Sequence, residues 1–242
     1  MKRTILLSVL GVLGVIPAHA TDTTLEQMPP KLETQYALSA LPPAMRDQAT
    51  VYLLNPKSGY QPTRQGTSGV TCLVERTAWE QADFRNDIYV PLCYDAAGSK
   101  TYLKVIMDAA ALRIQGVSPA ALKAEIERRY KDRTYKVPDK PGVSYMVAPV
   151  MRTWMLPDWH VHTMPMQHVM FYAPNLTDQD IGSDPSSFPL YPFVFKEGIA
   201  EQSYMIQVAG EAERARIMAE EKPLLDELCG YRDVLCVPHM QH

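Results

Sequence analysis

The order of the elements that the sequence predicts indicates an α+β fold with a mainly antiparallel sheet. Segments of β-type composition come first, helical segments follow in the middle of the chain, and β-type segments return after them. A regular alternation of strand and helix, which would indicate a parallel sheet, is not found in the sequence. We therefore expect a sheet with two central helices and a helical C-terminal appendage, large enough to bury a core without metal or disulfides.

The first part of the chain predicts a lead-in followed by three extended segments. The lead-in covers residues 21–48, is interrupted by prolines, and contains one short helix around Lys31 to Leu41. A glycine-rich turn at Gly66 to Gly69 separates the first extended segment from the second. These segments have the composition of strands and lie at residues 49–54, 70–75 and 87–94.

Two helices are expected in the middle of the chain, over residues 103–115 and 119–133. Ser118 precedes the second helix, where its hydroxyl can accept a hydrogen bond from a free backbone amide. Leu122 and Ile126 lie on one face of that helix at helical spacing. We expect this face to pack on the sheet, which makes the helix a structural element.

The second half of the chain returns to strands and then ends in helices. A charged helix is expected over residues 211–222, and Pro223 begins a second helical piece. We assign residues 49–208 to the α+β domain and residues 209–242 to a helical C-terminal extension. The returning strands are expected at residues 143–149, 168–173, 192–195 and 204–208.

The four cysteines are an even number, which predicts two disulfides if the chain folds in an oxidising compartment. Proximity in the sequence favours Cys72 with Cys93, and Cys229 with Cys236, over the two other connectivities. A zinc site made from the four thiolates is the less favoured alternative, because the close C-x2-C pairs of a zinc ribbon are missing.

The first twenty residues have the pattern of an export signal. Lys2 and Arg3 precede an apolar run from Ile5 to Ile16, and a small-residue site ends at Ala20. The run is shorter than the about 20 residues that cross a bilayer. We expect cleavage after Ala20, a periplasmic or secreted bacterial protein, and no membrane insertion after cleavage.

The charge of the chain argues against two classes of partner. The formal net charge is −3, and removal of Lys2 and Arg3 with the signal would change it to −5. A chain with this balance has no evident attraction to nucleic acid or to an anionic membrane. No nucleic acid partner is therefore expected, and the other partners stay unknown.

Six short stretches of the chain resemble a group of uncharacterised bacterial secreted proteins to which no activity is attached. The stretches spread over most of residues 38–208. The resemblance implies an exported α+β domain in which two cysteines match Cys72 and Cys93, and it includes His168. The stretches are ATVYLL (49–54), RQGTSGVTC (64–72), PLCYD (91–95), PGVSYMV (141–147), QHVMFYAP (167–174) and PFVFKEG (192–198).

The stretch WMLPDWHVHTMPMQHVM, residues 154–170, concentrates histidine and methionine. With the strand period of two, every even position from 160 to 170 carries a nitrogen or sulfur donor. A hairpin centred on Pro165 would bring these side chains into opposed pairs, with β-carbons about 5 Å apart. The expected pairs are His162 with His168, Met164 with Met166, and His160 with Met170.

This set of donors predicts a site for Cu(I) or Ag(I), because thioether sulfur is soft and imidazole is borderline. The competing interpretation is packing, since methionine fills irregular cores and an alternating stripe is typical of any half-buried strand. Pro157 and Pro165 also bound a short segment that could be a loop. The candidate ligands are His160, His162, His168, Met164, Met166 and Met170.

A catalytic interpretation makes His168 the general base of a hydrolase, oriented by Asp158 or Asp180. The sequence supplies no nucleophile with a signature, because Ser68 does not lie in a G-x-S-x-G motif. The function that we expect is therefore a non-catalytic binding or structural protein of the cell envelope. Cu(I) binding and hydrolysis are the two alternatives.

Overall fold

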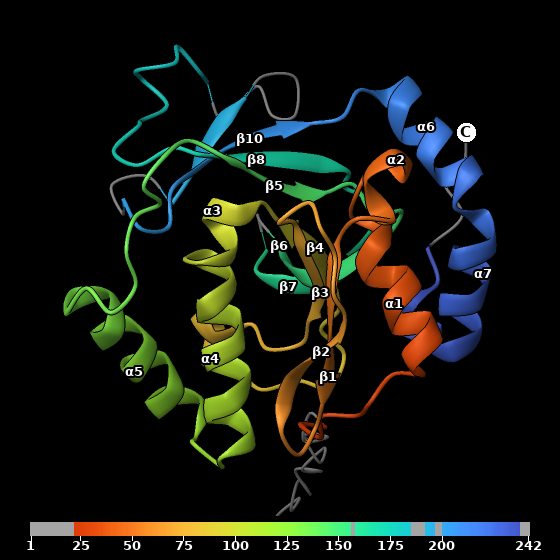
Figure 1. Cartoon of the computed structure of the whole chain (residues 1–242), viewed down its shortest axis with the longest axis horizontal. Helices are drawn as coiled ribbons and strands as arrows, with labels where there is room; N and C mark the ends of the chain where they lie inside the picture. The colour runs from red at the N-terminus through yellow and green to blue at the C-terminus, as the bar shows by residue number, and fades with distance from the viewer. Residues whose placement is uncertain (1–21, 156–157, 185–191, 197–199, 238–242) are drawn as a thin grey trace, which may run out of the picture.

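The fold is built on one eight-stranded sheet with helices on both of its faces (Figure 1). The structure is a computed structural model that describes residues 22–155, 158–184, 192–196 and 200–237. Helices and a mostly antiparallel sheet occur together, which confirms the predicted α+β class. The predicted signal segment, residues 1–20, lies outside the described residues.

The large sheet has the strand order β2-β1-β3-β4-β5-β8-β10-β9. Its neighbouring strands are antiparallel except for β1 and β3, which run parallel. Strands β6 and β7 form a separate two-stranded ribbon. The strands are β1 (Thr50–Asn55), β2 (Gly59–Arg64), β3 (Thr71–Glu75), β4 (Val90–Tyr94), β5 (Val143–Met146), β6 (Met151–Met155), β7 (His160–Met164), β8 (His168–Tyr172), β9 (Phe193–Phe195) and β10 (Tyr204–Val208).

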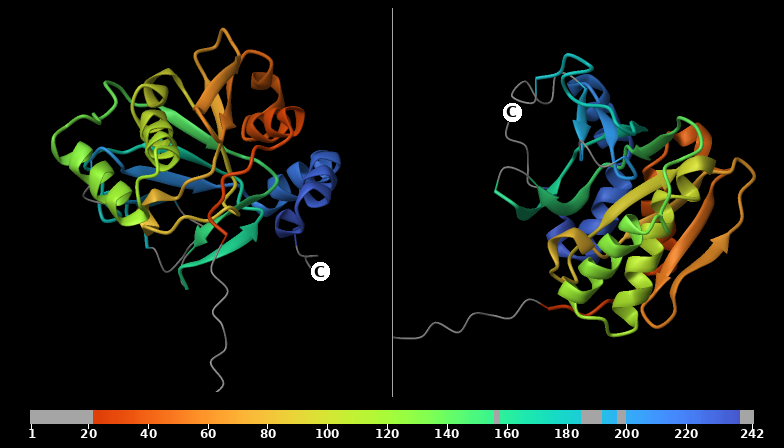
Figure 2. Two further views of the ribbon diagram at one scale, coloured as in Figure 1. Left: turned by 90° about the horizontal axis from the view of Figure 1, so that it is seen from below. Right: turned by 90° about the vertical axis from the view of Figure 1, so that its left-hand side faces the viewer.

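Helices α1 and α7 lie on one side of the large sheet, and α4 and α5 lie on the other (Figures 1 and 2). The two predicted central helices correspond to α4 and α5, and the Ser118 hydroxyl accepts from the amide of Ala121 at the start of α5. The helices are α1 (Pro30–Ser39), α2 (Pro43–Arg46), α3 (Ala96–Ser99), α4 (Tyr102–Ile114), α5 (Pro119–Lys131), α6 (Glu211–Glu220) and α7 (Lys222–Tyr231), with 3-10 turns η1 (Trp79–Gln81) and η3 (Asp233–Leu235).

Alternating side chains of the central strands divide the core into two parts. Cys72 and Val74 of β3 belong to the cluster on the α1 side. Leu73, from the same strand, joins Leu92 of β4 in the cluster on the α4 side. The period of two along β3 therefore directs Glu75, two residues after Leu73, toward α4.

The C-terminal helices complete the core on the α1 side. Leu224, Leu228 and Leu235 are buried in the same cluster as Tyr36 of α1 and Val51 of β1. Each buried leucine contributes roughly 1.5 to 3 kcal/mol relative to an exposed one. The predicted helical C-terminal segment is thus present and is packed against the lead-in helix.

Both predicted disulfides are confirmed. Cys72 and Cys93 occupy directly paired positions of β3 and β4, with a Cα–Cα distance of 4.1 Å. Cys229 of α7 joins Cys236, which follows η3. The first bridge lies inside the core and the second closes a short loop near the C-terminus.

Arginine side chains hold the lead-in through its backbone. Arg113 of α4 donates to the carbonyl oxygen of Thr23, and Arg76 donates to that of Glu26. Arg76 is buried, lies 3.9 Å from the ring centroid of Tyr89, and also donates to two carbonyl oxygens of the segment before β4. The start of the described chain is therefore docked against the body of the fold.

Two strands, β2 and β6, were not predicted from the sequence. Strand β2 carries Pro62, which pairs with Tyr52 of β1. Proline is tolerated there because β2 is the edge of the sheet and needs no hydrogen-bond partner on its outer side. Strand β6 lies in a proline-rich region, and it is recognised as a strand by its pairing with β7.

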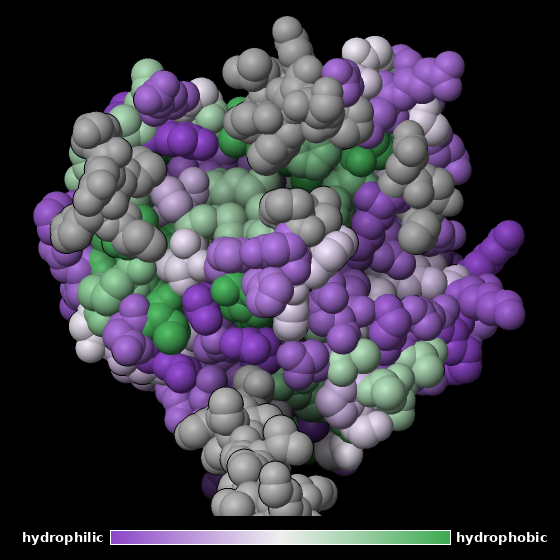
Figure 3. Space-filling view, turned by 180° about the vertical axis from the view of Figure 1, so that it is seen from behind, coloured by the Kyte–Doolittle hydropathy of each residue, from purple (hydrophilic) through white to green (hydrophobic). Residues whose placement is uncertain are grey.

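The surface seen from behind has apolar patches separated by hydrophilic groups (Figure 3). Among the described residues, the exposed large apolar side chains are Trp159, Phe171 and Phe195. No helix within the described parts of the chain is both long and apolar enough to cross a membrane.

Candidate functional site

The predicted histidine and methionine hairpin is wrong, because its two limbs belong to different sheets. In the ribbon, β7 pairs with β6, so that His162 lies opposite Thr153 and Met164 lies opposite Met151. Strand β8, which carries His168 and Met170, instead pairs with β5 and β10. The predicted segment from residue 160 does form a strand, but Pro165 does not turn it onto β8.

The six candidate ligands separate into two kinds of environment. The side chains of His160 and His162 are 76% and 48% exposed, and Nε2 of His162 lies 2.9 Å from a carboxylate oxygen of Asp158. Met170 is buried in the core on the α4 side, and Met164 and Met166 pack against the same cluster. The methionines therefore act as packing residues, as the competing interpretation predicts.

The described residues contain no group of three or more histidine, cysteine, aspartate or glutamate side chains placed to hold a metal ion. The structure thus brings the three methionines together, and it brings His160 and His162 together, but it places these two groups in different surroundings. Cu(I) binding by the full stripe stays a prediction from the sequence.

His168 lies in a setting that does not suit a general base. It is buried, and its Nδ1 lies 2.7 Å from the carbonyl oxygen of Met166. Burial lowers its pKa, which the contact with that carbonyl opposes. Within the described residues neither Asp158 nor Asp180 is hydrogen-bonded to it, since Asp158 bonds to His162 and Asp180 to Thr177.

A pocket of about 170 Å³ lies between the large sheet and helices α4 and α5, and we name it the tyrosine pocket. Apolar and aromatic side chains make most of its wall, while two glutamates, a lysine and a glutamine supply its polar groups. The lining residues are Glu75, Trp79, Glu80, Val90, Leu92, Tyr94, Tyr102, Val105, Ile106, Tyr130, Met146, Met170, Phe195, Lys196, Gln202 and Tyr204.

Tyr102, the first residue of α4, is the centre of a group of aromatic rings. Its ring centroid lies 4.6 Å from that of Tyr204, 4.9 Å from that of Tyr172 and 6.0 Å from that of Tyr94. The Tyr102 hydroxyl is buried and has no hydrogen-bond partner among the described residues. A buried hydroxyl without a partner costs free energy, so a ligand that bonded to it would recover that cost.

Glu75 supplies an acid group to the pocket. Its carboxyl group has no hydrogen bond or ion pair within the described parts of the chain. Burial raises the pKa of Glu75 to about 8, with a further rise from the charge of Glu80 and an opposing effect from Lys196. Strongly shifted acids in a concave site are typical of functional positions.

Lys196 and Glu80 form an ion pair at one end of the pocket. The Nζ atom of Lys196 lies 2.8 Å from Oε1 of Glu80 and 2.8 Å from Oε1 of Gln202. It also lies 5.4 Å from the ring centroid of Trp79. Glu80 thus forms an ion pair with Lys196, whereas an ionised Glu75 forms no ion pair with any of the described residues.

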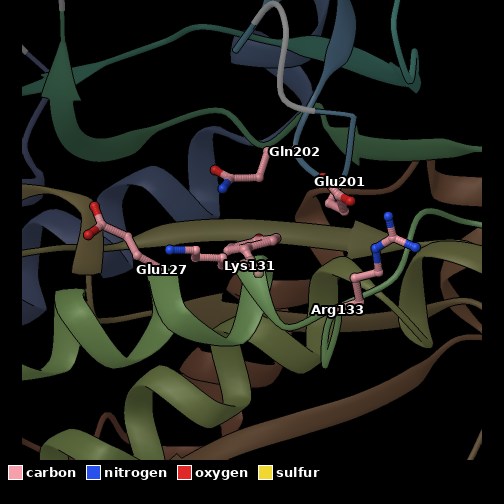
Figure 4. A pocket seen from close by; sticks show the side chains of 6 residues that line it. Glu127, Lys131, Arg133, Glu201 and Gln202 are labelled. Atoms are coloured by element: carbon pink, nitrogen blue, oxygen red, sulfur yellow. The ribbon is translucent and has the colours of Figure 1, made fainter.

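A wider and more polar pocket of about 420 Å³ adjoins the tyrosine pocket (Figure 4). Both pockets are lined by Tyr130 and Gln202, so they share a wall. Figure 4 shows Gln202 on one side and Glu127 and Lys131 of α5 on the other. Arg133 and Glu201 line the same wider pocket, which therefore has charges of both signs.

Two glycines allow the aromatic group to pack closely. A β-carbon on Gly98 of α3 would lie 1.9 Å from the Tyr172 hydroxyl, and one on Gly142 would lie 2.2 Å from Oδ2 of Asp95. Asp95 in turn caps α3 through the amides of residues 97 and 98. Close approach of these backbones therefore sets the position of Tyr172 beneath Tyr102.

The sequence contains signals for this pocket outside the stretch that is rich in histidine and methionine. In TCLVE, residues 71–75, Glu75 lies two residues after Leu73, so both side chains point to the same face of the strand. Glu75 is therefore an acidic residue on a face that should be apolar. Four of the six short stretches quoted above from residues 38–208 also supply lining residues. These are PLCYD with Tyr94, PGVSYMV with Met146, QHVMFYAP with Met170, and PFVFKEG with Phe195 and Lys196.

The chain was compared with protein-family models, with curated proteins and with solved structures. No family model, no curated protein and no solved structure matches it. The function is therefore inferred from the chemistry of the site.

Proposed function

We propose that the chain is an exported, non-catalytic binding protein of the cell envelope that holds a small ligand in the tyrosine pocket. The observation that carries this proposal is the pair of unpartnered polar groups, the Glu75 carboxyl and the Tyr102 hydroxyl, inside an aromatic pocket. A few polar groups within an apolar wall are typical of ligand sites.

The size of the pocket limits the ligand. A volume of about 170 Å³ is close to that of an engineered cavity of about 150 Å³ that binds benzene. Pockets for drug-sized molecules are larger, at about 300 to 1,000 Å³. The part of the ligand inside the tyrosine pocket should therefore be about the size of a benzene molecule.

Export is supported by two independent features. The N-terminal residues have a charged start, an apolar run and a small-residue site that ends at Ala20. The two disulfides suit an oxidising compartment outside the cytoplasm. Catalysis is not part of the proposal, because His168 is buried and bonds to a backbone carbonyl oxygen.

Methionine methyl NMR tests ligand binding directly. Met146 and Met170 line the pocket, whereas Met28 is buried in the core on the α1 side and serves as an internal control. Titration with a library of small fragments should shift the methyl signals of Met146 and Met170 and leave that of Met28 unchanged. A Val105→Phe variant, which fills part of the pocket, should lose these shifts. Absence of any fragment that moves the two pocket methyls in the natural chain would refute the proposal.

Expression of the full chain in a bacterial host tests export. The protein recovered from the periplasm or the medium should begin at Thr21 by N-terminal sequencing. Retention in the cytoplasm with Met1 at its start would contradict the export part of the proposal and leave the binding part unaffected.

A further inference from the structure

The tyrosine pocket has the parts of a site for a positively charged ligand. Glu75, Glu80 and Lys196 are its charged lining residues, and Lys196 already pairs with Glu80 over 2.8 Å. An ionised Glu75 would therefore leave the three groups with a net charge of about −1, because Lys196, the cation that acts on Glu75, already forms its ion pair with Glu80. A bound cation would supply the missing charge.

The walls of the pocket suit a cation as well. Six of its sixteen lining side chains are aromatic, and their faces attract positive charge through the ring quadrupole. The protein itself shows this preference, because Nζ of Lys196 lies within 5.5 Å of the ring centroids of both Trp79 and Phe195. The aromatic residues are Trp79, Tyr94, Tyr102, Tyr130, Phe195 and Tyr204.

The free hydroxyl of Tyr102 adds a hydrogen-bond acceptor. It is buried, lines the pocket, and has no partner in the described parts of the chain. An ammonium group has N–H donors and no acceptor, so it matches the acceptor oxygen of Tyr102 as well as the Glu75 carboxylate, both of which line the pocket. A neutral alcohol of the same size can donate only once.

We infer that the ligand of the tyrosine pocket is a compact organic cation with an ammonium group, held by Glu75 and Tyr102 among the aromatic rings. This inference rests on the proposed function and narrows it to one class of ligand. The volume of about 170 Å³ fits a small alkylammonium ion.

Binding of such a cation requires the ionised form of Glu75. Because burial raises the pKa of Glu75, binding near neutral pH is coupled to release of a proton. Affinity should therefore rise about tenfold for each pH unit up to the pKa of Glu75 and level off above it. The charged and titratable groups that face Glu75 from the surrounding elements are Tyr60, Glu80, Tyr94, Tyr102, Tyr130, Lys196 and Tyr204.

Calorimetric titration of the mature protein with n-butylammonium chloride and with 1-butanol tests the inference. The two probes have the same size and differ in charge. At pH 9 the ammonium probe should bind at least about tenfold more tightly than the alcohol. Between pH 6 and pH 8 its affinity should rise, and titrations in buffers of different ionisation enthalpy should show that about one proton is released per ligand.

Matched variants identify the residue that recognises the charge. Glu75→Gln keeps the shape of the side chain and should abolish both the preference for the cation and the rise of its affinity with pH. Glu33→Gln changes a buried glutamate that accepts from the amide of Leu54 and does not line the pocket, so this variant should retain both the preference for the cation and the rise of affinity with pH. Tyr102→Phe should weaken the ammonium probe severalfold without removing the preference.

The outcomes separate the inference from the proposed function. If 1-butanol binds as tightly as the ammonium probe, the cation inference is wrong and the small-ligand pocket stands. If neither probe binds while neutral fragments shift Met146 and Met170, the inference is again overturned and the proposed function stands. Should Glu75→Gln not fold, the pH dependence in the natural chain decides, and a flat affinity between pH 6 and pH 9 contradicts the role of Glu75.

Discussion

The Tyr172 hydroxyl donates a hydrogen bond of 2.9 Å to Oδ1 of Asp95. The other oxygen of this carboxylate accepts from the amide of Val143 at the start of β5. Asp95 therefore joins β4, β5 and β8 at one point, and it holds the Tyr172 ring against Tyr102. The position of the Tyr102 ring in the tyrosine pocket therefore depends on the contact between Asp95, which caps α3, and Tyr172 of β8.

Gly98→Ala should disturb the contact between Tyr172 and Asp95. The added methyl group would lie 1.9 Å from the Tyr172 hydroxyl, so the ring or α3 must move. We expect a loss of about 1 to 3 kcal/mol in the free energy of unfolding, which is typical of overpacking. Urea denaturation followed by circular dichroism measures it.

Gly230→Ala provides the matched control, because this glycine also lies in a helix and its β-carbon would meet no atom within 4 Å. The same substitution should there stabilise the protein by roughly 0.5 to 1 kcal/mol, through the higher helix propensity of alanine. An equal loss in both variants would show that Gly98 has no special packing role.

Glu33→Gln should stabilise the protein at pH 8. Glu33 is buried on α1, and only one of its carboxylate oxygens has a hydrogen-bond partner among the described residues. Burial raises its pKa to about 7 from an ordinary 4.5, which the bond from the Leu54 amide and the charge of Arg76 oppose. The stability that the protonated group provides is full below pH 4.5 and is lost as pH rises through 7.

The free energy of unfolding of the Glu33→Gln variant should therefore change less between pH 4.5 and pH 7 than that of the natural chain. The gain at pH 8 should reach up to about 3 kcal/mol, at about 1.4 kcal/mol per pKa unit. The part of the pH dependence that comes from Glu75 has the same sign and should remain. A variant that matches the natural chain at every pH would contradict the shifted pKa of Glu33.

Asp87→Asn should destabilise the protein at neutral pH. Asp87 accepts from Arg85 and from Arg152 of β6, and thus ties the ribbon to the segment before β4. Burial alone would raise its pKa, but the bonds from the two arginines outweigh this effect and lower the pKa to about 2. We expect a loss of about 2 kcal/mol at pH 7.

The stability that Asp87 provides is present above pH 3.8 and is lost as pH falls through 2. The difference in the free energy of unfolding between Asp87→Asn and the natural chain should accordingly become smaller below pH 3. Asp226→Asn, which breaks an exposed pair with Lys222, should cost less than about 1 kcal/mol and is the control. An equal loss in the free energy of unfolding for the two variants would show that the ion pair between Asp87 and Arg152 contributes no more than an exposed pair.

Replacement of Cys72 and Cys93 by alanine should cost more than replacement of Cys229 and Cys236. The first bridge closes a separation of 21 residues and the second a separation of 7. Loop entropy then gives about 3 and about 2 kcal/mol, and the first pair also leaves a space in the core. Thermal unfolding of the two double variants compares them, and a reversed order would contradict this account.

Local signals in the sequence predicted most of the fold. The cap at Ser118, the spacing of the cysteines and the β-type stretches each specify structure over a few residues, and all of them match the observed elements. The failures lie where pairing is decided over long distances. The partner of β7 is β6 rather than β8, and nothing within residues 154–170 encodes that choice, because a strand period does not identify the partner strand.

The tyrosine pocket was beyond prediction for the same reason. Its lining residues come from both halves of the chain, between Glu75 and Tyr204, and they meet only once the sheet is assembled. The histidines and methionines of residues 154–170, in contrast, lie close together in the sequence. The rings and the acid that lie close together in space are far apart along the chain, although Glu75 is recognisable in the sequence as an acid on an apolar face of its strand.

The docking of the lead-in by Arg76 and Arg113 has a practical consequence for engineering. Both guanidinium groups bond to carbonyl oxygens, of Glu26 and Thr23, and such oxygens are common to all twenty amino acids. These two hydrogen bonds thus do not depend on the side chains at positions 23 and 26, although the Glu26 carboxylate also pairs with Arg232. A purification tag joined ahead of Asp22 would leave both hydrogen bonds in place, whereas a proline inserted between Thr23 and Glu26 would redirect the peptide planes and break them.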